Sequence, residues 1–412
     1  MPRFRTAPPR RVAHLLAWLL GGVLVAALAA PTVAASGPVS AATTAPAPRA
    51  APTPALGTAS AEPVSGLALG NDRLPDCAAA VAGLSARDRL AQRLMVGVGG
   101  GDPTAVADAV HRTQVGGIFV DGNAVALFTG QALRAVQATS RLPLAVAVDD
   151  EGGRVQRIDA LVGDLPSART LAATRAPGQV QQVARDRARE LVARGITMNM
   201  APDVDVTEQP ARAVIGDRSF GQDADTVTAF AGAYAQGQRE AGMFTVLKHF
   251  PGHGHASGDS HRGRVTTPPL DRLKGDDLRP YAALLGRGGP LAGGRTGVMV
   301  GHLDVPGLTD RWPSTLTPAA YRLLRDEYDF DGLVLTDDLG AMKAISGELA
   351  LPQAVEAALA AGADMALWTS HEPAGPVLDG LAQALAAGRL DARANDAAAQ
   401  RVLAAKGVCS RR

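Results

Sequence analysis

The chain has 412 residues, of which 46% are hydrophobic and 20% are charged, so it is long and apolar enough to bury a sizeable core. Its 41 basic residues nearly balance its 40 acidic residues, which leaves a formal net charge of +1. This balance argues against a nucleic acid or another polyanion as the partner.

The first 36 residues have the features of a secretory signal peptide. Four arginines precede an uncharged apolar run over residues 15–30, and Val33-Ala34-Ala35 then fits a signal-peptidase site. The run has about 16 residues, whereas a membrane-spanning helix needs about 20. We therefore expect residues 1–36 to be a cleaved signal peptide, with an uncleaved N-terminal anchor as the alternative. The protein would be exported, and either secreted or associated with the cell envelope.

Residues 37–75 are rich in Ala, Pro, Thr, Ser and Gly, a composition that predicts a disordered linker. The folded domain is expected over residues 76–412. Its two cysteines, Cys77 and Cys409, are the only ones in the chain and lie near the two ends of this domain. Since exported proteins meet an oxidising environment, we expect a disulfide between them, with two free thiols as the alternative.

Eight short apolar runs follow, each bounded by Gly, Pro or Asp, as is typical of buried parallel strands. Segments with helical periodicity lie between most of them, at 107–113, 126–137, 179–195, 225–242, 317–329 and 354–362. Eight such units favour a single (β/α)8 TIM-like barrel of the α/β class over a doubly wound open sheet. The runs are 93–99, 115–120, 144–148, 196–201, 244–250, 297–303, 332–336 and 364–369.

Polar side chains lie at or just after the C-terminal ends of six of the eight runs. In a barrel the C-terminal ends of the strands meet at one face, where active sites lie, so we expect these side chains to gather there. Helix caps or turns would account for one or two such positions but poorly for six in succession. In chain order they are Asp149, Asp203 with Asp205, Lys248 with His249, His302, Asp337 with Asp338, and His371.

Residues 247–261 read LKHFPGHGHASGDSH and hold four of the chain's eight histidines. A metal site would draw on His253, His255, Asp259 and His261, because short His-rich tracts are metal candidates. Pro and Gly make this stretch a loop, however, and the chain has no H-E-x-x-H motif. We therefore expect no metal and no cofactor, and a metal-dependent barrel hydrolase remains an alternative.

Acid/base chemistry is the second interpretation of the same loop. Asp259 and His261 are two residues apart, which places both side chains on one side of an extended segment. A carboxylate beside an imidazole fixes its tautomer and favours its protonated form, so His261 could act as a general acid. Asp337 could be a nucleophile, although strand alternation does not tell whether Asp337 or Asp338 points inward, and the pair could simply cap the next helix.

Four motifs then bring a resemblance to a known family. The pattern K-H-F-P-G-H-G-x4-D-S-H at 248–261 is joined by V-D-x-E-G-G-R-V-Q-R at 148–157, I-G-x-R-S-F-G at 215–221 and T-D-D-L-G-x-M at 336–342. Together they resemble glycoside hydrolase family 3, and more narrowly its NagZ-type bacterial β-N-acetylglucosaminidases. The resemblance covers about residues 85–405, the whole expected barrel.

The resemblance implies a role for each matching residue. Asp337 would be the nucleophile, and His261 the acid/base residue with Asp259 as its partner. The residues expected to hold the hydroxyls of the N-acetylglucosamine ring are Asp149, Arg157, Arg218, Lys248 and His249.

The implied activity is retaining exo-β-N-acetylglucosaminidase (β-N-acetylhexosaminidase) action through a covalent glycosyl-enzyme. Export suggests peptidoglycan or its fragments as the substrate. A phosphorylase of the same family and a non-catalytic wall-binding module are alternatives. We expect a monomer that binds carbohydrate and no nucleic acid, and that touches a membrane only through an uncleaved N-terminus.

Two smaller expectations concern the loop itself. His255 falls at a variable position and is expected to be solvated. Gly252, Gly254 and Gly258 are expected to let the loop move.

Overall fold

The computed structural model describes residues 74–99, 102–122 and 124–411. The predicted signal peptide lies outside this range, as does all of the predicted linker except its last two residues. The predicted segment boundaries therefore stay predictions. In the described part of the chain, no helix is both long and apolar enough to span a membrane.

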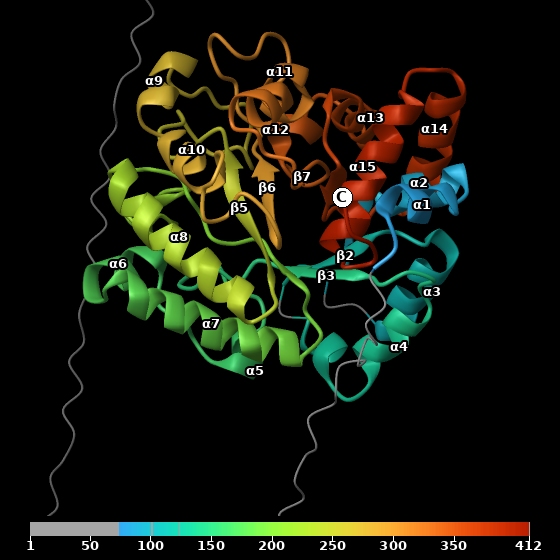
Figure 1. The fold of residues 1–412 in the computed structure, drawn as a ribbon, viewed down its shortest axis with the longest axis horizontal. Helices are drawn as coiled ribbons and strands as arrows, with labels where there is room; N and C mark the ends of the chain where they lie inside the picture. The colour runs from blue at the N-terminus through green and yellow to red at the C-terminus, as the bar shows by residue number, and fades with distance from the viewer. Residues whose placement is uncertain (1–73, 100–101, 123, 412) are drawn as a thin grey trace, which may run out of the picture. The chain divides into compact units, whose positions relative to one another are not determined.

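Eight parallel strands form a closed barrel in chain order, with the last strand paired back to the first. Figure 1 shows strands of this barrel at the centre of the fold with helices around them. Each of the eight predicted apolar runs overlaps one strand, and the predicted (β/α)8 architecture is confirmed. The strands are β1 (Leu94–Gly97), β2 (Gly117–Val120), β3 (Ala145–Val148), β4 (Met198–Asn199), β5 (Phe244–Phe250), β6 (Thr296–Val300), β7 (Leu333–Asp338) and β8 (Met365–Trp368).

Side chains alternate between the inside of the barrel and the helical layer outside it. In β3, Ala147 belongs to the inner cluster whereas Val146 and Val148 pack in the outer one. In β7, Leu333 and Leu335 face inward in the same way. This alternation follows from the two-residue period of a strand, so every second residue continues toward the interior or its mouth.

Helices cover the outside of the barrel between successive strands. The two longest, α7 (Pro177–Ala193) and α8 (Ala224–Glu240), lie side by side. The others on this layer are α3 (Pro103–Thr113), α4 (Ala132–Ala138), α10 (Arg279–Leu285), α11 (Pro318–Arg322), α13 (Leu351–Ala361) and α14 (Ala374–Ala386). Shorter helices in the connections are α5 (Asp159–Val162), α6 (Ala168–Thr174), α9 (Leu270–Gly275) and α12 (Lys343–Ser346).

Two predicted helices differ from the observed ones. The segment 126–137 is broken into a 3₁₀ turn (Val125–Phe128) and α4, because Gly130 adopts a positive φ of 60° that an α-helix does not allow. The segment 317–329 begins as α11 and continues as a π-helical stretch, Leu323–Glu327.

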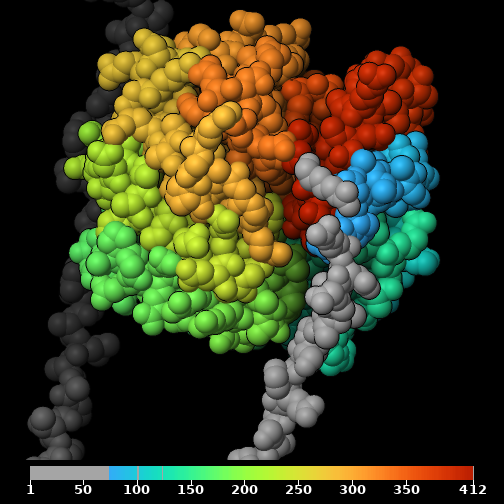
Figure 2. Space-filling model, viewed as in Figure 1, coloured from blue at the N-terminus to red at the C-terminus, as the bar shows by residue number. Residues whose placement is uncertain are grey.

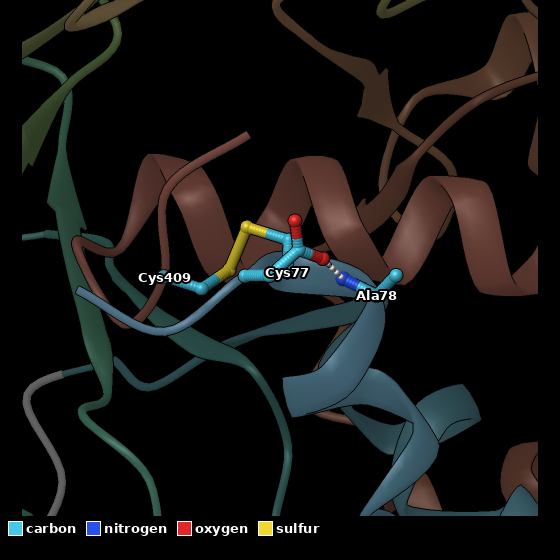
Figure 3. Close-up of a disulfide and its surroundings, with 4 residues drawn as sticks. Cys77, Ala78 and Cys409 are labelled. Carbon is cyan, nitrogen blue, oxygen red and sulfur yellow. Dashed lines mark hydrogen bonds between the residues drawn. A yellow bond between two sulfur atoms is a disulfide. The ribbon is translucent and has the colours of Figure 1, made fainter. Parts of the chain in front are cut away.

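The first and last helices close the N-terminal end of the barrel. Helices α1 (Cys77–Ala82) and α2 (Ala86–Gln92) pack against α15 (Ala392–Ala405), and Figure 2 shows the two ends of the described chain in contact. Val402 of α15 belongs to the same cluster as the inner barrel residues. The disulfide Cys77–Cys409 joins the two ends, which confirms that prediction (Figure 3).

Candidate active site

A cavity of about 750 Å³ opens at the C-terminal ends of the strands. This volume is within the range of pockets that bind small ligands. All eight residues predicted to act on the sugar line this one cavity, although they come from five separate parts of the chain. They are Asp149, Arg157, Arg218, Lys248, His249, Asp259, His261 and Asp337.

The structure distinguishes the two adjacent carboxylates at the end of β7. The pairing of β7 with β8 is irregular between Leu335 and Asp338, and both Asp337 and Asp338 line the cavity. The carboxylate of Asp338 is occupied by the loop that follows, because it accepts hydrogen bonds from the backbone N–H groups of Gly340 and Thr369 and from the Thr369 hydroxyl. Both residues line the cavity, but the hydrogen bonds of Asp338 commit its carboxylate to the surrounding backbone, whereas the carboxylate of Asp337 is left open to the cavity.

Asp337 is held as a carboxylate. Desolvation opposes its ionisation, but His302 and His249, together with the backbone N–H of Asp338 at 2.9 Å, lower its pKa to about 2. Within the described chain, no other hydrogen bond reaches this carboxylate. An ionised carboxylate with a free oxygen at a cavity wall has the properties of a nucleophile.

A buried ion network forms the base of the cavity. Lys248 Nζ lies 2.6 Å from Asp149 Oδ1 and 2.5 Å from Glu151 Oε1, and Arg218 donates two hydrogen bonds of 2.8 Å to Glu151. Burial opposes the charge on Glu151, yet Arg218 and Lys248 lower its pKa below the usual range. Arg157 adds an ion pair of 3.6 Å to Asp149. The network fixes several charged groups where a polar ligand would rest.

Strand β5 directs two successive side chains toward this site. Phe244 and Val246 point into the barrel, and Lys248 is the next residue in this two-residue alternation. Alternation alone would therefore point His249 out of the barrel, away from the cavity. The pairing of β5 with β6 is irregular between Leu247 and Phe250, and both Lys248 and His249 line the cavity.

The Asp259–His261 pair forms as predicted. His261 Nδ1 lies 2.7 Å from Asp259 Oδ1, which also accepts a 3.0 Å hydrogen bond from the His261 backbone N–H. The His261 side chain is 62% exposed, so its other ring nitrogen is accessible to a ligand. The loop end is held by α12, since the backbone N–H of Lys343 donates to the His261 carbonyl. This arrangement suits an imidazole that donates and accepts protons through Nε2.

The expectation that His255 is solvated is wrong. His255 is half-buried and paired with Asp277, whose carboxylate oxygens lie 3.0 Å from Nδ1. Gly252 and Gly254 lie at close approaches: a Cβ on Gly254 would lie 1.9 Å from the Val206 carbonyl, and one on Gly252 would lie 2.5 Å from Asp277 Cβ. The movement of the loop stays a prediction. The first half of the loop is packed, and of the three glycines only Gly258 has space around it.

The four histidine-loop residues considered as metal ligands do not form one cluster. His253 Nε2 lies 3.0 Å from Ser260 Oγ, His255 pairs with Asp277, and Asp259 pairs with His261. Among the described residues, two other groups could present ligands to a cation: Asp203, Asp205 and His249, and also His255, Asp276 and Asp277.

The charge around the first of these groups disfavours a cation. Arg218 Nη2 lies 3.3 Å from His249 Nε2 and 3.7 Å from Asp203 Oδ2. A guanidinium therefore already supplies positive charge at this position.

Sequence reasoning gave no role to three residues that shape the site. Glu151 joins Lys248 to Arg218, Asp205 binds His249, and His302 lies close enough to Asp337 to lower its pKa. Each lies at or just after the C-terminal end of a predicted strand, so the pattern of polar residues at strand ends contained the signal. That pattern does not tell which of several such residues contact a ligand and which support a neighbour.

Comparison with known protein families identifies the family of this chain. Residues 85–405 match the family model described as the glycosyl hydrolase family 3 N-terminal domain. The chain belongs to glycoside hydrolase family 3. Over 332 residues it is 52% identical to a protein named Beta-hexosaminidase LpqI from Mycobacterium tuberculosis, an alignment that covers 79% of this chain and 83% of that protein.

Solved structures of the family agree with the fold. A family 3 glycosyl hydrolase from Mycobacterium smegmatis is similar with a TM-score of 0.76 at 50% identity, covering 80% of this chain and 99% of that one. A β-N-acetylhexosaminidase from Beutenbergia cavernae is similar with a TM-score of 0.70 at 31% identity, covering 79% of this chain and 100% of that one. The predicted family resemblance is confirmed.

Proposed function

We propose that this family 3 hydrolase is a retaining exo-β-N-acetylglucosaminidase, an enzyme of the β-N-acetylhexosaminidase type. The observation that carries the proposal is the pairing of an ionised Asp337 with an Asp259-supported His261 at one sugar-sized cavity. Relatives named β-hexosaminidase support the substrate class and do not favour the phosphorylase alternative.

The first displacement forms a covalent glycosyl-enzyme. An oxygen of Asp337 attacks the anomeric carbon as the bond to the leaving group breaks, and His261 Nε2 gives its proton to the departing oxygen. Asp259 accepts the hydrogen bond from His261 Nδ1 at 2.7 Å, so the imidazole keeps its orientation as its charge changes.

The second displacement releases the sugar. The neutral imidazole of His261 takes a proton from water at Nε2, and the water oxygen forms a bond to the anomeric carbon as the bond to Asp337 breaks. Two inversions at the same carbon retain the configuration. His261 is again protonated at the end, which completes the cycle.

Binding of the sugar is assigned to the charged network. Lys248, Arg218 and Asp149 can form charge-assisted hydrogen bonds to ring hydroxyls, with His249 and Arg157 beside them. Because their mutual ion pairs fix these side chains before the sugar arrives, little reorganisation is needed to hold the anomeric carbon in line with Asp337.

The natural substrate is proposed to be GlcNAc-containing saccharides of the cell wall, cleaved outside the cytoplasm. The N-terminal signal features support export, and so does the Cys77–Cys409 disulfide, since disulfides persist in oxidising compartments. Cell fractionation that finds the protein only in the cytoplasm would contradict this localisation.

Two substitutions separate the roles of nucleophile and acid/base. Asp337→Ala is expected to abolish turnover of every aryl N-acetyl-β-glucosaminide. His261→Ala is expected to reduce turnover of poor leaving groups by about 10²–10⁴-fold and to spare activated ones, because a good leaving group departs without a proton. Steady-state kinetics over a series of phenols of increasing pKa measures both effects.

The same assay has an internal control for the reaction type. Wild-type turnover should be equal in phosphate and in an inert buffer, with the free sugar as product. A uniform loss across all leaving groups in His261→Ala would contradict the acid role. A sugar 1-phosphate product would contradict hydrolysis.

A further inference from the structure

Asp205 lies directly behind the cavity, where it contacts both the sugar-binding strand and the catalytic loop. It follows β4 and is fully buried. Its Oδ1 accepts backbone N–H groups from His253 at 2.6 Å and from His249 at 3.3 Å, and its Oδ2 lies 2.7 Å from His249 Nδ1. One carboxylate therefore contacts both His249 and the start of the loop that carries Asp259 and His261.

These contacts determine which nitrogen of His249 carries the proton. Burial, aided by Arg218, lowers the pKa of His249 to about 4, so the ring is neutral and has a single N–H. Burial raises the pKa of Asp205, whereas the backbone N–H groups of His253 and His249 that its Oδ1 accepts favour the carboxylate. As a carboxylate, Asp205 favours that hydrogen on Nδ1. On the other side, Arg218 Nη2 lies 3.3 Å from Nε2 and can only donate. Both neighbours select the tautomer whose Nε2 is an acceptor.

We propose that Asp205 is a positioning residue that fixes His249 as a hydrogen-bond acceptor toward a hydroxyl of the bound sugar. Asp205 itself does not line the cavity, so it acts through His249. The sugar contact rests on the proposed function, whereas the tautomer of His249 does not. The two parts can therefore fail separately.

The substitution Asp205→Asn reverses the direction of the hydrogen bond between residue 205 and His249 Nδ1 and keeps the two backbone hydrogen bonds. The two backbone N–H groups at Oδ1 require an acceptor, so the amide oxygen takes that position and the amide nitrogen replaces Oδ2. The new N–H group then points at His249 Nδ1, which has to accept. The ring proton moves to Nε2, where it opposes the N–H of Arg218.

The first readout is independent of activity. In protein with ¹⁵N-labelled histidine, two-bond ¹H–¹⁵N correlation spectra distinguish the Nδ1–H from the Nε2–H tautomer. The ring signals of His249 are assigned by their loss in His249→Ala. We expect Nδ1–H in the wild type and Nε2–H in Asp205→Asn. A wild-type His249 with its proton on Nε2 would overturn the proposal even in an inactive protein.

The second readout is kinetic. Asp205→Asn should lower kcat/KM by about 100-fold, the loss expected when one preorganised hydrogen bond is removed. The loss should be the same for activated and poor leaving groups, since His261 and Asp259 keep their contacts. A loss confined to poor leaving groups would mean that Asp205 acts through the loop and not through His249, and would overturn the proposal.

Two controls separate positioning from a structural role. Thr207→Val removes the 2.7 Å hydrogen bond from the Thr207 hydroxyl to the Gly254 carbonyl, another anchor of the same loop, and touches neither His249 nor Asp205. It should change kcat/KM less than fivefold. In a His249→Ala background, Asp205→Asn should add less than threefold, because residues that act through one another are not additive. A full 100-fold additional loss there would contradict the proposal.

Discussion

At the end of β7, Asp337 and Asp338 have identical side chains and different surroundings. Asp337 lines the cavity and is left with one hydrogen bond among the described residues. Asp338 is surrounded by the turn that follows it and by Thr369 of the neighbouring strand end. The chemical difference between the two thus comes from backbone geometry.

This contrast predicts opposite consequences for two matched substitutions. Asp338→Ala leaves several backbone N–H groups without an acceptor and should lower the free energy of unfolding by about 1–3 kcal/mol, with measurable turnover retained. Asp337→Ala should abolish turnover and change the stability by less than about 1 kcal/mol, because it removes few contacts. Denaturant unfolding beside the glycoside assay measures both. The reverse pattern would mean that the two roles have been exchanged.

Part of this site could be predicted from residue spacing. The two-residue spacing of Asp259 and His261 gave their pairing correctly, because a local contact depends on little besides backbone direction. The direction in which His249 points, toward the cavity, could not be predicted, since the pairing of β5 with β6 is irregular at this position. The role of Asp205 could not be predicted either, because its partners lie more than 40 residues away in the chain.

The connection after β5 is the element on which the site depends most. Its first half is packed against the segment after β4, where the Gly254 carbonyl accepts hydrogen bonds from Thr207 and Gln209. Its second half ends at the exposed His261, where backbone N–H groups of α12 donate hydrogen bonds to the carbonyls of Ser260 and His261. The element thus combines a packed base with an accessible end that carries the proposed acid/base residue.

Two glycines on this loop form a matched pair. Gly254→Ala would place a Cβ 1.9 Å from the Val206 carbonyl, so the base of the loop has to shift, at a cost of about 1–3 kcal/mol. A Cβ on Gly258 would first meet Val265 Cγ1 at 3.6 Å, an ordinary contact. We expect Gly254→Ala to lower the melting temperature and Gly258→Ala to melt like the wild type. Equal melting temperatures for the two variants would contradict the packed base.

At the scale of the whole molecule, the barrel was the feature that the sequence predicted best. Eight apolar runs separated by amphipathic segments leave few ways to bury the strands, and closure between β1 and β8 removes the exposed edges. Helix ends were less predictable: the break at Gly130 depends on one positive φ. The disulfide pairing was predictable because the chain has only two cysteines.

Buried histidines at the mouth of the barrel make the stability depend on pH. Burial, with His249 close by, lowers the pKa of His253 from about 6.5 to about 4, so the folded state binds this proton less readily than the unfolded chain. The stability that neutral His253 contributes to the folded state is fully present above pH 6.5 and is lost as the pH falls toward 4. The pKa of His249 is lowered to about 4 as well, with the same sign. The hydrogen bond to Asp277 raises the pKa of His255, so the sign is opposite. The stability that His255 contributes is present below pH 6.5 and is lost as the pH rises through its raised folded-state pKa.

The variant that tests this pH dependence is His253→Gln, which keeps a polar group near Ser260 and does not titrate. The free energy of unfolding should fall less between pH 7 and pH 4.5 in this variant than in the wild type, by up to about 3 kcal/mol. Denaturant titrations at a series of pH values measure the difference. An identical pH dependence in both proteins would contradict a neutral, buried His253.

The central claim is that Asp337 becomes covalently bonded to the sugar, and trapping this species tests it most directly. A 5-fluoro N-acetylglucosaminyl fluoride forms the glycosyl-enzyme faster than water releases it, so intact-protein mass spectrometry should show one added sugar. Peptide mapping should place the label on Asp337, and Asp337→Ala should remain unlabelled. A label on another residue would contradict the account, as would turnover with inversion at the anomeric carbon and no labelled protein.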